Sequence, residues 1–220
     1  MSRCGFGLGA LWLACALTPF GCAPRPEGSL TLASTRPLAL SAEILATGVH
    51  GASCVPAGLF DPPRVGNWGY AVEEAIRQAP GANALTHAKL YVTVDGIFSA
   101  KACFHTHGDA VRVEPVGGSP LAAERPSDVL MERLPRVAPV FFDLSGYFSV
   151  LSTRALSLPI ERRSEVMVEV CAAYDKGMQK TVETAIAKTS DANAVMNASV
   201  EVSPLGCHRV KGIAVRLPSP

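Results

Sequence analysis

The chain carries almost no net charge and no run of like charges. Its 220 residues contain 20 Lys and Arg against 19 Asp and Glu, a formal net charge of +1. One of these basic residues, Arg3, lies near the N-terminus, so the remainder of the chain is balanced. A protein that held nucleic acid or anionic lipid by bulk charge would need an excess of basic residues. We therefore expect no nucleic-acid partner.

The sequence also lacks the short motifs of several common chemistries. It has no Cys-x-x-Cys pair, no Gly-x-Ser-x-Gly motif, and no Gly-rich loop between a strand and a helix. These absences argue against thiol redox catalysis, against serine hydrolysis and against a phosphate-binding loop. We predict a non-catalytic protein that uses no cofactor.

Long apolar stretches are absent except at the N-terminus. Arg3 precedes the apolar stretch "GFGLGALWLACAL" at residues 5–17, which is too short for a membrane-spanning helix and typical of an export signal. The following "TPFGC" resembles a bacterial lipobox with Cys22 as the lipidated residue, although Pro19 stands where a branched apolar residue is usual. Cys15 is a second candidate for lipidation, and plain secretion and an uncleaved anchor are alternatives.

These features predict a location. We expect a lipid-anchored protein of the bacterial cell envelope that faces the periplasm or the cell surface. Its expected partners are the membrane, through the N-terminal lipid, and another envelope protein.

Four blocks of sequence occur twice in the same order. "STRPLAL" matches "STRALSL", "AVEEAI" matches "TVETAI", "ANALTHAKLYV" matches "ANAVMNASVEV", and "CFHTHGDAVRV" matches "CHRVKGIAVRL". The shared order and the matching cysteines indicate an internal duplication. We predict an export signal at 1–22, a tether at 23–32, repeat 1 at 33–115, a linker at 116–145 and repeat 2 at 146–220.

Each repeat has the pattern of a β-β-α-β-β unit. A short strand carries the "STR" block, a second leads to the first cysteine, a third begins at the "ANA" phrase, and the last follows the second cysteine. The helix of repeat 1 is expected from about Trp68 to Gln78. The fold class is therefore α+β, an antiparallel sheet with a helix on one face of each repeat. The apolar stripes of the two helices are Val72, Ala75, Ile76 and Ala79, and Val182, Ala185 and Ile186.

Seven cysteines divide into two groups. Three lie in the N-terminal segment, and four lie in the repeats, two at matching places in each. An exported chain meets oxidising conditions, and four cysteines permit three pairings. Because a single repeat would need its own bridge, we predict Cys54 with Cys103 and Cys171 with Cys207. Each bridge is expected to contribute about 4 kcal/mol to stability.

The block "CFHTHG" holds the sharpest candidate for a ligand site. His105 and His107 are two residues apart, so both project from one face of a strand, and two imidazoles with a thiolate could hold zinc or copper. His50 and His87 are further candidate ligands. Against this, Cys103 is expected in a disulfide, and the second copy reads "CHRVKG". A metal or small-ligand site on this strand is therefore the alternative to a structural or protein-binding role.

Trp68 and Tyr70 are expected in the longer loop of repeat 1, and repeat 2 has no Trp. An exposed Trp there could contact a partner protein. It could equally fasten the loop to the helix, and this packing role is the interpretation that we favour.

Two further pairs of residues have structural interpretations. Asn83 and Asn193 occupy equivalent places between helix and strand, where we expect a turn role with the side chain bonded to backbone. Glu73 and Glu74 lie early in the first helix, where they complement its dipole and are expected on a solvated face.

Each repeat resembles two kinds of small exported bacterial protein over about 70 residues. "GASC" at 51–54, the Ala-rich helix and the terminal Cys-x4-Gly are similar to the TRL-like family. The "ANA" turn and the paired cysteines are similar to RcsF-like envelope lipoproteins. The first resemblance implies no known activity, and the second implies envelope sensing through partner proteins.

Overall fold

The computed structural model describes residues 25–56, 68–95, 101–114, 141–160, 162–171, 176–202 and 207–218. In chain order it contains β1 (Arg25–Ser34), β2 (Ala42–Pro56), α2 (Trp68–Arg77), β3 (Ala84–Asp95), β4 (Lys101–Val113), β5 (Phe141–Ser152), β6 (Arg162–Val170), α3 (Gly177–Ala187), β7 (Ala194–Val202) and β8 (His208–Arg216). We call the part up to residue 114 the first half and the part from residue 141 the second half. The predicted export signal and Cys22 lie outside the described residues.

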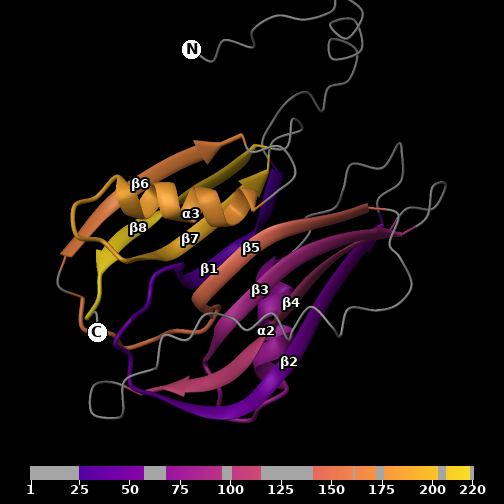
Figure 1. Ribbon diagram of the computed structural model, residues 1–220, viewed down its shortest axis with the longest axis horizontal. Coiled ribbons are helices and arrows are strands. Elements are labelled where there is room, and N and C mark those ends of the chain that lie inside the picture. The colour runs from indigo at the N-terminus through magenta and orange to yellow at the C-terminus, as the bar shows by residue number, and fades with distance from the viewer. Residues whose placement is uncertain are drawn as a thin grey trace, which may run out of the picture.

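The eight strands form one antiparallel sheet in the order β2-β4-β3-β5-β1-β7-β8-β6 (Figure 1). The α+β class is as predicted, but the expectation of one sheet for each repeat is corrected to one shared sheet. The reason is that β1 pairs with β7 and β5 pairs with β3, so the first strand of each half joins strands of the other half.

The strand order has a symmetry of its own. If β1 is exchanged with β5, β2 with β6, β3 with β7 and β4 with β8, the same order is obtained from the opposite edge. β1 and β5 are neighbours at the centre, where Ala33 pairs with Leu151. Each half therefore contributes an outer three-stranded group and one central strand.

The boundaries of the central strands differ from the predicted segments. β1 begins at Arg25, within the predicted tether, and β5 begins at Phe141, within the predicted linker. The "STR" blocks were expected in strands, but only their first residue is in one, because β1 ends at Ser34 and β5 ends at Ser152. Ser34 and Ser152 are the last residues paired in the ladder, and each Ser hydroxyl accepts a hydrogen bond from the amide two residues on, of Arg36 (3.1 Å) or Arg154 (3.0 Å), in a turn that follows the strand.

Both helices form where apolar residues recur at helical spacing. The predicted stripes are confirmed as buried, and Trp68 and Met178 extend them. α2 packs on β2, β4 and β1, and α3 packs on β6, β8 and β5. In Figure 1, α3 lies across the orange and yellow strands of the second half. The buried side chains of both helices belong to one apolar core against the sheet.

A second, smaller apolar cluster contains the leucines of the "STR" blocks. Leu38 and Leu40 are buried there, and Leu156 and Leu158 pack against the cluster. It also includes Val111 of β4, next to Ala110 of the main core. Because neighbouring strand residues point to opposite faces, the second cluster covers the sheet face away from the helices.

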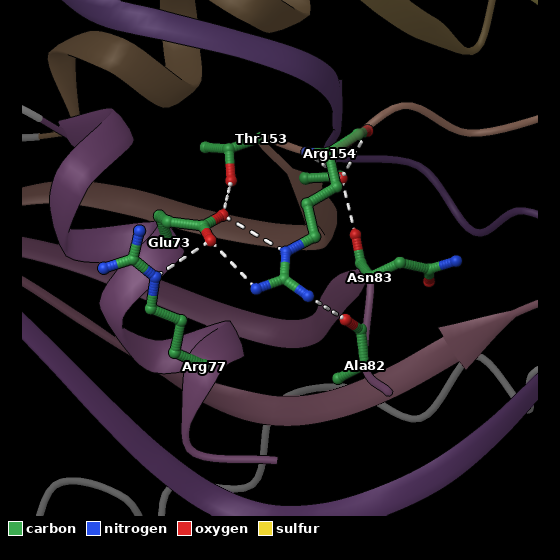
Figure 2. A network of polar contacts seen from close by, with 7 residues as sticks. Glu73, Arg77, Ala82, Asn83, Thr153 and Arg154 are labelled. Atoms are coloured by element: carbon green, nitrogen blue, oxygen red, sulfur yellow. Dashed lines mark hydrogen bonds and ion pairs between the residues drawn. The ribbon is translucent and has the colours of Figure 1, made fainter. Parts of the chain in front are cut away.

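The "STR" block of each half contacts the "ANA" turn of the other half. Ser34 donates a hydrogen bond to the Asn193 carbonyl (2.6 Å), and Arg36 donates one to the Ala192 carbonyl (3.0 Å). The matching contacts are Ser152 to the Asn83 carbonyl (2.6 Å) and Arg154 to the Ala82 carbonyl (2.7 Å) (Figure 2). These crossed contacts hold the two halves together.

The two Asn side chains bind the backbone at the end of the last strand of their own half, Val113 in β4 and Leu217 directly after β8. Asn83 donates to the Val113 carbonyl (3.0 Å) and accepts from the Val113 amide (2.7 Å). Asn193 makes the same pair of bonds with Leu217, at 2.7 and 2.9 Å. The prediction of a turn role with the side chain bonded to backbone is confirmed, with the partners supplied by the strand that lies beside the turn.

Glu73 does not lie on a solvated face as predicted. Its carboxylate accepts hydrogen bonds from Arg154 (2.9 and 3.3 Å) and from the Thr153 hydroxyl (2.8 Å), and it pairs with Arg77 (3.2 Å) (Figure 2). The bonds from Arg154 are the main reason that the pKa of Glu73 is lowered. The expectation failed because Arg154 comes from the other half.

Each half has a β-bulge that faces a glycine. His87 and Asn197 adopt left-handed φ angles of 51° and 48°, where the pairing of β3 with β4 and of β7 with β8 shifts register. A Cβ atom on Gly108 would lie 2.9 Å from the Thr86 carbonyl oxygen. One on Gly212 would lie equally close to the Met196 oxygen, at 2.9 Å. This close approach explains the Cys-x4-Gly spacing in both halves.

Candidate functional site

The outer strands of the first half bring three histidines together on the face away from the helices. Phe104 meets Trp68 of α2, with ring centroids 4.9 Å apart, so this side of β4 faces the helix. His105 and His107 alternate with it and point to the other face, as predicted for a strand. His50 of β2 is the direct partner of His107 in the ladder, which places all three on one surface.

Strand β3 adds two polar side chains to the same surface. Tyr91 pairs with His105 across the ladder, and Thr93 pairs with Cys103. We call His50, His105, His107, Tyr91 and Thr93 the histidine cluster. Tyr91 and Thr93 were missed from the sequence, although their alternation with apolar residues in "LYVTV" is the signal that would have placed them on one face.

Hydrogen bonds link the cluster in two chains. His50 Nε2 lies 3.1 Å from His105 Nδ1, and His105 Nε2 lies 3.0 Å from Thr93 Oγ1. Separately, His107 Nε2 lies 3.0 Å from the Tyr91 hydroxyl. The His50 and His107 rings stack with centroids 4.2 Å apart, and the His105 and Tyr91 rings stack at 4.7 Å. The cluster is therefore an ordered set of aromatic rings rather than a solvated surface.

Burial keeps His50, His107 and Tyr91 uncharged near neutral pH. Desolvation, with His50, His105 and Lys89 nearby, lowers the pKa of His107 to about 4. Desolvation also lowers the pKa of His50 and raises the pKa of Tyr91 to about 12. Neutral imidazoles can act as hydrogen-bond partners or as ligands to a metal ion.

Lys89 borders the cluster on β3. Its side chain is 2% exposed, and burial lowers its pKa. Its Nζ atom lies 5.8 Å from the ring centroids of Tyr91 and Tyr147. The ammonium group therefore sits beside two aromatic faces, which attract cations.

His87, the fourth candidate ligand, does not join the others. Its Nδ1 atom lies within hydrogen-bond distance (3.1 Å) of Asp109 Oδ2, beside the bulge. The structure thus brings together three of the four histidines that the sequence suggested.

The second half carries ion pairs at the matching positions. Arg209 stands two residues after Cys207 as His105 stands two after Cys103, and its ladder partners are Glu169 and Glu201. Arg209 bonds to Glu169 at 2.6 Å and to Glu201 at 3.4 Å. The same surface of the same fold is thus built without histidines, so packing alone does not require them.

The predicted cysteine pairs are present. Cys54 joins Cys103, its direct partner in the ladder of β2 and β4, and Cys171 joins Cys207. The second pair lies close to Glu169, which would make three potential metal ligands. Because both sulfurs are in the disulfide and Glu169 pairs with Arg209, this group does not offer a metal site.

Trp68 and Tyr70, the candidate partner contact, differ in their exposure to solvent. Trp68 is fully buried against Phe104 of β4, and the loop that it was expected to fasten lies outside the described residues, so that role stays a prediction. Tyr70 is 66% exposed on α2.

None of the helices in the described part of the chain is long and apolar enough to cross a membrane.

A comparison with protein families, curated proteins and solved structures finds no match to this chain. The resemblances to TRL-like and RcsF-like proteins therefore stay predictions.

Proposed function

We propose that the protein is a non-catalytic component of the bacterial cell envelope, exported and held at the membrane by a lipid on Cys22, with a structural or protein-binding role. The observation that carries this proposal is the pair of disulfides at matching places in the two halves. Disulfides form and persist in oxidising compartments, which is where the N-terminal signal would direct the chain.

The proposal includes an internal duplication. Its support is that four features recur at matched positions: the crossed contacts of the "STR" blocks, the Asn bonds to the last strand, the bulges that face Gly108 and Gly212, and the disulfides. Two unrelated segments would have no physical reason to share all four.

The intact mass of the protein from its native membrane fraction tests the location. We expect a diacylglyceryl group on a chain that begins at Cys22, and a gain of about four hydrogens on reduction, two for each disulfide. Cys22→Ala should abolish the lipid mass, whereas the matched control Cys15→Ala should leave it unchanged. An unlipidated chain with free thiols would contradict the proposal.

A second candidate function is favoured by the contrast between the halves. The histidine cluster lies where the second half has the ion pairs of Arg209, so we propose that the cluster binds a small ligand. The test copies the second half into the first with the triple substitution Ala52→Glu, Tyr91→Glu and His105→Arg.

Native mass spectrometry of protein purified from the envelope provides the measurement. The wild-type protein should retain a non-protein mass that the triple variant lacks, while both keep the same circular dichroism. If the wild-type protein and the triple variant retain the same non-protein mass, or none, a binding role for the cluster is contradicted.

A further inference from the structure

We propose that the ligand of the histidine cluster is a divalent transition-metal ion of the copper or zinc class, held by His50 Nε2 and His105 Nδ1. This inference rests on the second proposed function, the binding role of the cluster.

The two nitrogen atoms already have nearly the spacing that one ion requires. They lie 3.1 Å apart. Imidazole nitrogens bind zinc at about 2.0–2.1 Å, so two of them on a tetrahedral ion are about 3.3 Å apart. The two rings are nearly coplanar, with centroids 5.3 Å apart, so their nitrogens face one another, and both rings would have to rotate for the two lone pairs to meet at one point beside the line that joins them. The ion would then take the place of the hydrogen that the two rings share.

Thr93 provides the support that metal-bound histidines usually have. When Thr93 Oγ1 accepts the Nε2 hydrogen of His105, the lone pair of that ring is at Nδ1, the atom that faces His50. A hydrogen bond to the second ring nitrogen fixes the tautomer and the orientation of a metal ligand. The hydrogen on His50 Nε2 would move to its own Nδ1, so both ligands stay neutral.

His107 supplies a further nitrogen beside the pair. Its ring stacks on that of His50 with centroids 4.2 Å apart, and its Nε2 atom is held by Tyr91. The three ring nitrogens do not converge on one point in this arrangement. Water would therefore complete the coordination, and His107 could join only if its ring turned away from Tyr91.

Access and donor type decide which ions fit. β2 is an edge strand of the sheet, so His50 lies at the rim of the molecule, and the rings of His50 and His105 are partly exposed. Imidazole donors suit copper and zinc, whereas calcium and magnesium prefer oxygen. Asp109, the carboxylate farther along β4, is paired with His87. We expect Cu²⁺ to bind more tightly than Zn²⁺, following the general order of affinities.

The test titrates the disulfide-bonded mature chain with Cu²⁺, Zn²⁺ and Ca²⁺ by calorimetry. We expect about one equivalent of Cu²⁺, weaker Zn²⁺ binding and no Ca²⁺ binding. The paramagnetic resonance spectrum of the Cu²⁺ complex should show splitting by imidazole nitrogen. His105→Gln and His50→Gln should remove this splitting and weaken Cu²⁺ binding by more than about tenfold, and Thr93→Val should weaken it by about tenfold.

His87→Asn is the matched control. It removes a histidine on the same face, and Asn197 shows that Asn adopts the same left-handed backbone in the second half. Its Cu²⁺ affinity should equal that of the wild type. Circular dichroism and a free-thiol assay confirm that each variant is folded and has both disulfides.

The outcomes separate this inference from the function on which it rests. Cu²⁺ binding that needs His50 and His105 supports both. If the wild-type protein binds no Cu²⁺ or Zn²⁺ but its native form carries another mass that the triple variant lacks, the metal inference fails and the binding site remains. If it binds no metal and carries no such mass, both fail. Metal binding that survives His50→Gln and His105→Gln overturns the site.

Discussion

Among single residues, Arg154 shows how the two halves depend on each other. Its guanidinium binds the Glu73 carboxylate of α2 through two hydrogen bonds and the Ala82 carbonyl through a third. A planar guanidinium with two bonds to one carboxylate is the strong form of an ion pair. By contrast, Arg77 meets Glu73 within one helix and is 66% exposed.

We predict that Arg154→Ala destabilises the protein far more than Arg77→Ala. Loss of the three bonds leaves the Ala82 carbonyl without this donor and Glu73 with only Thr153 and Arg77, and should lower the free energy of unfolding by about 1–3 kcal/mol. Arg77→Ala should cost less than about 0.5 kcal/mol, because exposed pairs one helical turn apart contribute little. Urea unfolding of the three proteins measures both values. Equal effects would show that the bonds of Arg154 are not important for stability.

The candidate site shows which residues the sequence could place. The spacing of His105 and His107 was sufficient to put both on one face, because alternation is a local property of a strand. The contribution of Tyr91 and the ion pair of Glu73 depend on which segments become neighbours. Arg154 is 81 residues from Glu73, and no local pattern records such a contact.

At the scale of elements, the bulges explain a spacing that was visible as a repeated motif. The carbonyl of Thr86 or Met196 approaches the adjacent strand where the register shifts, and only a residue without a side chain fits opposite it. The motif was therefore readable in the sequence, but its reason lies in a neighbouring strand.

We predict that Gly212→Ala destabilises the second half. The new Cβ would lie 2.9 Å from the Met196 carbonyl oxygen and 2.9 Å from Val195 Cγ1. Relief requires a shift of backbone at the bulge, so the free energy of unfolding should fall by about 1–3 kcal/mol. The exposed neighbour Lys211→Ala is the control, with a change within about 0.5 kcal/mol. Thermal unfolding compares the two, and an unchanged midpoint for Gly212→Ala would refute the packing argument.

The elements themselves were predicted unevenly. The helices were found because Val72, Ile76 and their equivalents repeat at helical spacing, and the disulfides because the matching blocks of sequence suggested one bridge within each set. The prediction of a strand at the "STR" blocks was wrong, because Leu38 and Leu40 alternate as they would in a strand. Instead β1 ends at Ser34, whose hydroxyl donates a hydrogen bond to the Asn193 carbonyl, and this contact with a distant part of the chain leaves no local pattern.

For the whole molecule, the feature that sequence patterns could not predict is that the central strands cross over: β1 pairs with β7 of the other half, and β5 pairs with β3. The residues of β1 would alternate in the same way whether it paired with β3 of its own half or with β7 of the other half. The choice depends on contacts between the halves, such as those of Arg36 and Arg154.

We predict that neither half folds alone. A chain divided into residues 23–120 and 121–220 should give two fragments without a cooperative unfolding transition, because each lacks the central strand that completes its sheet. An equimolar mixture should regain the circular dichroism of the intact chain and run as one species on gel filtration. Arg154→Ala in the second fragment should weaken the association. Cooperative unfolding of either fragment alone would contradict the prediction.

The exchanged central strands also bear on how the histidine cluster arose. Under the duplication that we propose, an ancestral single unit would have formed this sheet as a two-fold homodimer, and every mutation would have appeared at both ends. Once the two units are fused into one polypeptide, a mutation in one half no longer appears in the other. Histidines could then accumulate in the first half while Arg209 and its carboxylate partners stayed in the second. The first half could thus gain a specialised surface without a loss of stability in the second half.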